Sequence, residues 1–214
     1  DAAFIPPHHD SVPELMGDLE KFWHNEAITL PHLIRVAISH YQFETIHPFL
    51  DGNGRIGRML IPLLLWQMRQ ISEPHFYISH FFEENKDEYI ERMRNVSAHG
   101  DWSGWCAFFC RAVSEQARQN LDIAEKITAL YEDMKNRLPD LLASKWTLTA
   151  LDALFTQPVF KANRFAIGHD IPKPTLQKLL KTLSDNQIIH TIEPAAGSRA
   201  ALYSFEPLLE LVRI

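Results

Sequence analysis

Strand patterns are almost absent from the first 184 residues of this 214-residue chain, and helical periods take their place. Apolar residues recur three to four positions apart at Leu15, Leu19 and Phe22, which is the spacing of one helix face. The segment 55–70, "RIGRMLIPLLLWQMRQ", is apolar on nearly every face and is typical of a buried central helix. We therefore expect a mainly α fold, built first as a helical bundle.

The pattern changes after Pro139, which we expect to end a long helix. Three short helical patterns follow, and two β-rich segments come after them, "IIHTIE" and "ALYSF". The helical patterns are "TLTALDALFTQ", "FKANRFAIGHD" and "PTLQKLLKTLSDNQ". Three helices with a two-stranded hairpin are the pattern of a winged helix containing a helix-turn-helix. We predict two domains, a bundle at 1–144 and a small winged-helix domain at 145–214.

Charge and cysteine content exclude some classes of protein. Residues 1–144 carry 13 basic against 21 acidic side chains, and residues 145–214 carry 8 against 6, so the chain is no polycation built for nucleic acid. No apolar run is long enough to span a membrane, and no signal peptide is visible. The two cysteines, Cys106 and Cys110, have no partners for a zinc set. We expect a cytoplasmic protein without a membrane partner.

One loop has the chemistry of a phosphate site: "HPFLDGNGRIGR", residues 47–58. Its glycines precede a strong helical pattern, and a helix N-terminus attracts anions through its unpaired N–H groups and its dipole. Arg55 and Arg58 can bind phosphate oxygens in a bidentate manner. Asp51 is a hard oxygen ligand suited to a Mg²⁺ that bridges phosphates. His47 is a natural general base at neutral pH.

The same stretch resembles the signature of the Fic family, H-P-F-x-[DE]-G-N-G-R-x-x-R, at every fixed position. Four flanking segments are similar to the family as well, so that the resemblance covers roughly residues 3–120. They are "FIPPHHDSVPELM", "AISHYQFETIHPF", "FEENKDEYIERM" and "GDWSGWCAFF". The resemblance implies a Fic-type helical bundle with a short N-terminal flap hairpin. It also implies a protein adenylyltransferase that moves AMP from ATP to a Ser, Thr or Tyr hydroxyl of a target protein.

The resemblance implies a role for each residue of the loop. His47 would be the catalytic base, Asp51 would hold Mg²⁺, and Phe49 would be buried as an anchor. The nucleotide-binding residues would be Gly52, Asn53, Gly54, Arg55, Ile56, Gly57 and Arg58, with the first three cradling phosphates and Arg58 holding the γ-phosphate. Tyr89 matches a position that contacts the nucleotide base, although a core tyrosine on an amphipathic helix fits it equally well.

The resemblance also implies partners and leaves alternatives open. A target segment would pair with the flap near Phe4 and Ile5 by strand addition. The inhibitory motif of many Fic proteins, [ST]-x-x-x-E-[GN], is missing, and "SHFFEE" at 79–84 lacks its last residue. Because the chain begins at the flap, we expect the Fic domain to be N-terminally incomplete. De-AMPylation, use of another nucleotide, a homodimer, and a DNA-binding regulator acting through Lys173, Lys178, Lys181 and Arg199 stay open.

Overall fold

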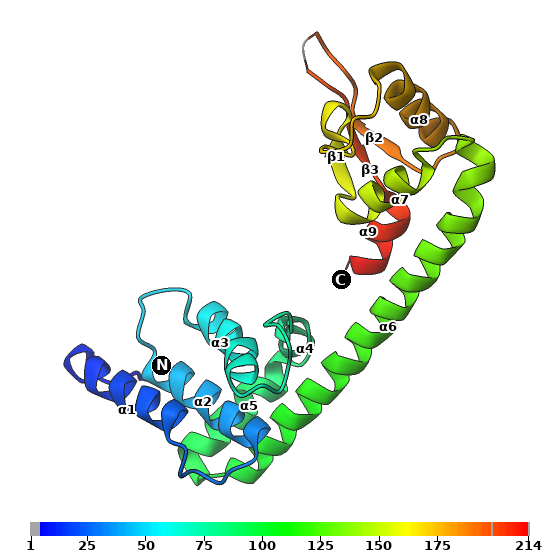
Figure 1. Cartoon of the computed structure of the whole chain (residues 1–214). Coiled ribbons are helices and arrows are strands. Elements are labelled where there is room, and N and C mark those ends of the chain that lie inside the picture. The colour runs from blue at the N-terminus through cyan, green and yellow to red at the C-terminus, as the bar shows by residue number, and fades with distance from the viewer. Residues whose placement is uncertain (1–4, 198, 214) are drawn as a thin grey trace. The chain divides into compact units, whose positions relative to one another are not determined.

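A computed structural model describes residues 5–197 and 199–213 (Figure 1). The elements divide between two compact units, residues 1–119 and 120–214. Before the dividing point the chain forms η1 (His9–Ser11), α1 (Val12–His24), α2 (His32–Ile46), α3 (Asn53–Gln67), α4 (Ser79–Glu84), α5 (Lys86–His99) and the first part of α6 (Trp102–Leu142). After it come the rest of α6, α7 (Thr147–Thr156), β1 (Val159–Lys161), η2 (Ala162–Arg164), α8 (Lys173–Asp185), β2 (His190–Glu193), β3 (Leu202–Ser204) and α9 (Glu206–Val212).

The N-terminal unit is a helical bundle with α2 and α3 packed closely at its centre. Its core is rich in rings: the ring centroids of Phe108 and Phe109 of α6 lie 6.1 and 6.3 Å from that of Phe82 of α4, and the Trp105 ring lies 6.0 Å from both. Such pairs contribute beyond the area they bury. The predicted mainly α fold is confirmed. The helix after the loop is buried on one face only: Ile61, Leu64 and Leu65 are at most 4% exposed, whereas the opposite side exposes 43 to 62% of Met59, Leu63 and Trp66.

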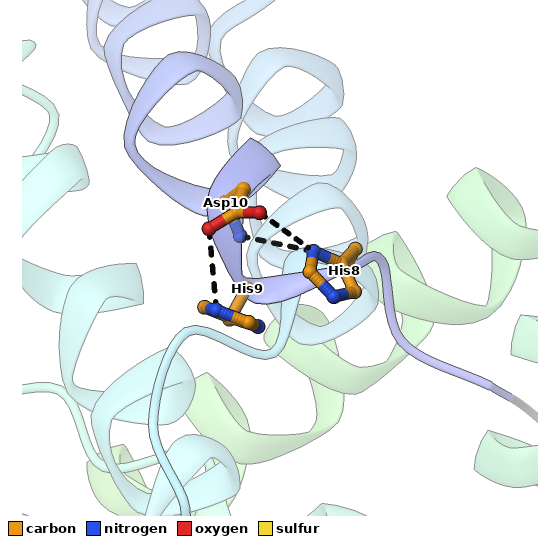
Figure 2. Close-up of side chains that lie close together, drawn as sticks. All are labelled: His8, His9 and Asp10. Carbon is orange, nitrogen blue, oxygen red and sulfur yellow. Dashed lines mark hydrogen bonds and ion pairs between the residues drawn. The ribbon is translucent and has the colours of Figure 1, made fainter.

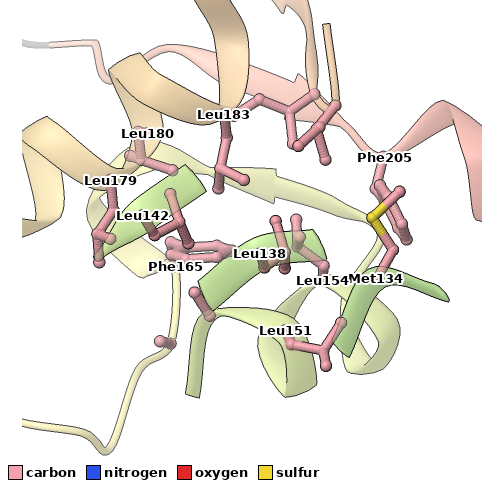
Figure 3. Close-up of a cluster of buried hydrophobic side chains, with 14 of the residues drawn as sticks. Met134, Leu138, Leu142, Leu151, Leu154, Phe165, Leu179, Leu180, Leu183 and Phe205 are labelled. Carbon is pink, nitrogen blue, oxygen red and sulfur yellow. The ribbon is translucent and has the colours of Figure 1, made fainter. Parts of the chain in front are cut away.

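The C-terminal unit packs its helices against a three-stranded antiparallel sheet of order β1-β3-β2. Figure 3 shows its core, where Leu179, Leu180 and Leu183 of α8 meet Leu151 and Leu154 of α7. The two predicted strands are present as β2 and β3. The first and third predicted helices are present as α7 and α8, whereas the sheet has a third strand, β1, that was not expected. The winged-helix domain stays a prediction.

Two expectations about this part of the chain are wrong. Pro139 does not end the long helix: α6 continues to Leu142, because Leu138 and Leu142 are buried in the C-terminal core and hold its last turn in place. The segment 160–170 forms no α-helix: it holds the end of β1, the short 3-10 helix η2 and turns, because Phe160 pairs with Tyr203 in the sheet and packs on Phe165. Tertiary contacts override local propensity at both places.

The units therefore divide at residues 119 and 120, inside α6, whereas the composition of the sequence changes near 144. The last turns of α6 belong to the C-terminal core through Met134, Leu138 and Leu142. The limits 1–144 and 145–214 stay a prediction about which segments fold independently.

The flap is only partly visible. Phe4 lies outside the described residues, and residues 5–8 carry no strand, with Ile5 strongly exposed. Pro6 and Pro7 have no backbone N–H to donate to a partner strand. The flap hairpin thus stays a prediction. Within the described residues, no helix combines the length and the apolar character needed to cross a membrane.

Candidate active site

His47 stands where α2 ends, in a left-handed backbone conformation with φ 51°. Its backbone N–H still donates to the carbonyl of Phe43 (3.1 Å), and Pro48 keeps the residue before it out of a right-handed helix. The imidazole Nδ1 lies 3.3 Å from the carbonyl oxygen of Glu44. Because a carbonyl only accepts, Nδ1 is the donor in this contact, and in the neutral ring Nε2 is the nitrogen left to accept a proton.

The loop between α2 and α3 is closed by Asn53. The buried Asn53 side chain accepts from the N–H of Phe49 (2.9 Å) and donates to its carbonyl (2.6 Å). The expectation of a buried Phe49 anchor is wrong, since its side chain is 48% exposed and meets Phe43 only at a ring distance of 6.5 Å. The two hydrogen bonds between the Asn53 amide and the Phe49 backbone hold the loop in place, because they define the geometry of the loop better than one ring contact does.

The first turn of α3 forms the anion-binding end of the loop. Gly52 caps the helix with φ 85°, a conformation that favours glycine, and its carbonyl accepts the first helical bond, from Ile56 (3.0 Å). The N–H groups of residues 53–55 therefore have no acceptor inside the helix. Arg55 is exposed and pairs with Asp51 at 3.1 Å, while Asp51 also accepts from the N–H of Gly52 at 2.7 Å.

Arg58 lies beside the same turn. Its Nε donates to the hydroxyl of Ser79, the first residue of "SHFFEE" and of α4, at 3.2 Å. A Cβ at Gly54 would lie 3.2 Å from Nη1 of Arg58. The guanidinium therefore lies over the start of α3, where the unpaired N–H groups are.

Glu44 fills the space behind this turn. A Cβ at Gly57 would overlap Oε1 of Glu44, so a larger residue there would force that carboxyl group to move. Oε1 is buried and has no hydrogen-bond partner among the described residues. Burial raises the pKa of Glu44, and the nearby charges of Arg58 and His47 oppose the rise.

Tyr89 belongs to the wall of a cavity of about 660 Å³ that also reaches Glu44. The remaining lining residues are Thr45, Ile90, Met93, Arg94, Ser97 and Ala98. The Tyr89 hydroxyl lies 3.0 Å from Nε2 of His40, so the two interpretations of this residue are compatible. The ring contributes to the core and also faces a cavity.

The structure thus brings His47, Asp51, Gly52, Gly54, Arg55 and Arg58 to one loop and one helix turn. Ile56 and Gly57 lie on the packed side, where Ile56 joins the core and Gly57 contacts Glu44. Sequence reasoning missed His40 and Glu44. They stand four residues apart, a spacing that puts both on one face of α2, and two polar side chains on a buried face are the signal that could have revealed them.

A second group of polar side chains lies at the start of α1. Figure 2 shows His8 and His9 on either side of Asp10, each with a ring nitrogen 3.2 Å from a carboxylate oxygen. All three residues are exposed. Their mutual pairing accounts for their arrangement.

The model of the Fic/DOC family matches residues 1–65, which include the whole 47–58 loop. This match lies within the N-terminal unit, which is similar to the Fic/DOC family over these residues. A probable protein adenylyltransferase of Aquifex aeolicus is 33% identical over 95 residues, covering 44% of this chain and 27% of that protein. The protein adenylyltransferase Fic of Drosophila erecta is 40% identical over 62 residues, covering 28% and 12%.

The Fic fold is supported by a solved structure too. A Fic family protein from Desulfovibrio desulfuricans has a TM-score of 0.51 and 22% identity, covering 94% of this chain and 56% of that one. The chain spans only about an eighth to a quarter of the length of the curated relatives named above. Their activity is therefore a proposal for this chain.

Proposed function

We propose that this chain is a protein adenylyltransferase, which transfers AMP from ATP to a hydroxyl side chain of a target protein. The observation that supports the proposal is that three features lie together at one loop. These are the unpaired N–H groups of residues 53–55, the guanidinium of Arg58 over the same turn, and His47 with Nε2 available. The names of the Aquifex and Drosophila relatives support the same activity.

The triphosphate would bind at the N-terminus of α3. There the N–H groups of residues 53–55 and the helix dipole favour negative charge. Arg58 would hold the γ-phosphate by exchanging its hydrogen bond to Ser79 for one to a phosphate oxygen, and Arg55 would bind next to it. The Asn53 side chain is used in closing the loop, so this residue would contribute only its backbone N–H.

Asp51 would hold Mg²⁺. Its carboxylate is exposed, offers hard oxygen atoms, and lies at the phosphate end of the loop, where it now pairs with Arg55. These donors fit a magnesium ion that keeps most of its waters. The ion would neutralise charge on the phosphates, and Arg55 would then be released from Asp51 to bind phosphate as well.

His47 would act on the nucleophile. Its Nδ1–H is directed to the Glu44 carbonyl, so Nε2 can take the proton of a target hydroxyl. The hydroxyl oxygen would then form a bond to the α-phosphorus in line with the bond to pyrophosphate, which breaks as pyrophosphate leaves. Catalysis of this kind depends mostly on positioning and on charge neutralisation.

The nucleoside would occupy the cavity of about 660 Å³ next to the loop. Its lining by Tyr89, Ile90 and Met93 is predominantly apolar, as expected for a site that holds a flat base. The target would approach along the chain near Ile5, which is exposed. Phe4 is the other residue of that proposal and lies outside the described part of the chain.

The test is mass spectrometry of the protein incubated with ATP, Mg²⁺ and a cell lysate. We expect one AMP group on the protein itself or on a lysate protein, and none when Mg²⁺ is removed. Release of AMP from premodified proteins without any transfer from ATP would show that the reverse reaction is the real activity. The absence of both AMP transfer and AMP release would contradict the proposal.

A further inference from the structure

His40 lies buried at the centre of the N-terminal unit, 1% exposed, and both of its ring nitrogens have protein partners. Nδ1 is 3.1 Å from the carbonyl of Gly57, and Nε2 is 3.0 Å from the hydroxyl of Tyr89. The ring stacks on Phe82 at 5.6 Å and on Trp105 at 6.1 Å. A buried polar side chain held this closely on every side has one orientation.

The partners fix the direction of both hydrogen bonds. A carbonyl only accepts, so Nδ1 of His40 carries the proton and donates to Gly57. In a neutral ring Nε2 is then an acceptor, and the Tyr89 hydroxyl donates to it. Burial lowers the pKa of His40 to about 4 and raises that of Tyr89, so both groups are neutral near pH 7.

This chain of bonds joins two places that are far apart in the sequence. Gly57 lies in α3 directly after its first turn and next to Arg58, close to where the phosphates would bind. Tyr89 belongs to α5 and to the wall of the cavity that would take the nucleoside. Glu44 lines the same cavity and lies against Gly57, so the cavity and the turn share a wall.

We propose that His40 is a positioning residue of the proposed transferase, holding the phosphate-binding turn of α3 and the Tyr89 wall of the cavity at one fixed separation. The inference rests on the proposed function for the identity of the ligand. ATP spans both places, so it binds well only when their separation matches the length of the nucleotide. Tripolyphosphate or adenosine alone touches one place and is insensitive to the separation.

Three variants test this. His40→Asn keeps an N–H donor for Gly57 and loses the acceptor for Tyr89, whereas Tyr89→Phe removes the hydroxyl and keeps the ring. The double variant removes the connection between α3 and α5 while the Gly57 carbonyl keeps a donor and no Tyr89 hydroxyl is left without an acceptor. Ser39→Ala is the matched control, since it deletes a buried hydroxyl of the neighbouring residue that bonds only to its own helix (Arg35 carbonyl, 2.7 Å).

The measurements are calorimetric titrations with Mg²⁺–ATP and with tripolyphosphate, and an NMR titration with adenosine, all below the unfolding temperature of each variant. We expect ATP affinity to fall about 10- to 100-fold in both single variants and no further in the double variant. Affinity for tripolyphosphate and for adenosine should stay within about threefold of the parent, and Ser39→Ala should match the parent throughout.

An equal loss of affinity for ATP, tripolyphosphate and adenosine would show general damage to the site and would overturn the proposal. Unchanged ATP affinity in the variants would overturn it as well. If the parent binds ATP but transfers no AMP, the proposed function fails while the titrations still decide the role of His40. If the parent binds none of the three ligands, both proposals fail.

Discussion

At the scale of single residues, the conformation of the loop at 47–58 depends on polar side chains, and the surroundings of each side chain decide which bonds it makes. Glu44 gives its backbone carbonyl to His47 and places its carboxyl group behind Arg58. Asn53 closes the loop instead of binding a ligand with its side chain. The exposed residues His47, Asp51 and Arg55 remain available for chemistry because buried neighbours hold the backbone in place.

The role of His47 leads to a prediction about transfer and binding. His47→Ala should abolish AMP transfer and change ATP affinity by no more than a few-fold, because the imidazole acts on the nucleophile and not on the triphosphate. Transfer is followed with radiolabelled ATP and binding by calorimetry. His24→Ala, a histidine at the end of α1 outside the loop, is the control and should transfer normally. A His47→Ala protein that transfers at the parent rate would rule out the base assignment.

Glu44 leads to a prediction about pH. Its pKa is raised in the folded state, so its contribution to stability is present below the ordinary value of 4.5 and is lost as pH rises through the folded pKa. Glu44→Gln should therefore raise Tm at pH 7, and the gain should shrink as pH falls towards 4.5. The measurement is thermal unfolding followed by circular dichroism at several pH values.

Glu88 is the matched control, because bonds from Arg111 and Arg92 lower its pKa. The contribution of Glu88 to the stability of the folded state is present above pH 4.5 and is lost as pH falls through the folded pKa. Glu88→Gln should thus lower Tm at pH 7, the opposite sign to Glu44→Gln. A lower Tm for Glu44→Gln at pH 7 would mean that its carboxyl group is stabilised by partners in the folded state.

At the scale of elements, the contact between α2 and α3 sets the position of the active loop. Both helices contribute to it: α2 ends at His47 in a left-handed turn, and α3 begins at Asn53 after Gly52. Their close approach involves Gly57, where a Cβ would overlap the Glu44 carboxyl group and lie 3.2 Å from the Phe43 ring.

Gly57→Ala tests this contact. Replacing a glycine inside a helix usually stabilises by up to about 1 kcal/mol, but here we expect a loss of roughly 1 to 3 kcal/mol from overpacking. Gly17→Ala in α1 is the control, because nothing lies within 4 Å of the added Cβ and the helical gain should appear. Chemical denaturation gives both values. Adding Glu44→Ala to Gly57→Ala should restore part of the loss, and failure to do so would place the strain elsewhere.

At the scale of the whole molecule, α6 takes part in two cores. Trp105, Phe108 and Phe109 belong to the N-terminal unit, and Met134, Leu138 and Leu142 belong to the C-terminal unit. The basic side chains proposed for DNA contact lie on the C-terminal unit, where Lys173, Lys178 and Lys181 are exposed and Arg199 pairs with Glu193 at 3.4 Å. This small set of charges predicts at most weak, salt-sensitive DNA binding.

Truncation tests how the units share α6. A fragment ending at residue 144 retains every proposed site residue and should keep AMP transfer, yet it exposes Met134, Leu138 and Leu142, which are at most 6% exposed in the chain. We expect it to self-associate in sedimentation experiments, because exposed apolar stripes on a helix associate. A fragment ending at residue 119 should stay monomeric and active. Loss of transfer in both folded fragments would show that the C-terminal unit takes part in the reaction or in target binding.

The sequence by itself determined the mainly α fold, the two strands β2 and β3, and the loop at 47–58, because these depend on local periodicity, glycine positions and residue chemistry. It could not determine that α6 runs past Pro139 or that 160–170 contributes a strand, since the buried partners of those residues lie far along the chain.

Only the tertiary structure decided which polar groups support the loop. His40 meets Tyr89 across 49 residues and Gly57 across 17. Glu44 fits behind α3 because the packing of two helices leaves room for it at a glycine. The identity of a residue states which bonds it can make, whereas burial and distance decide which of those bonds are made and which protonation state follows.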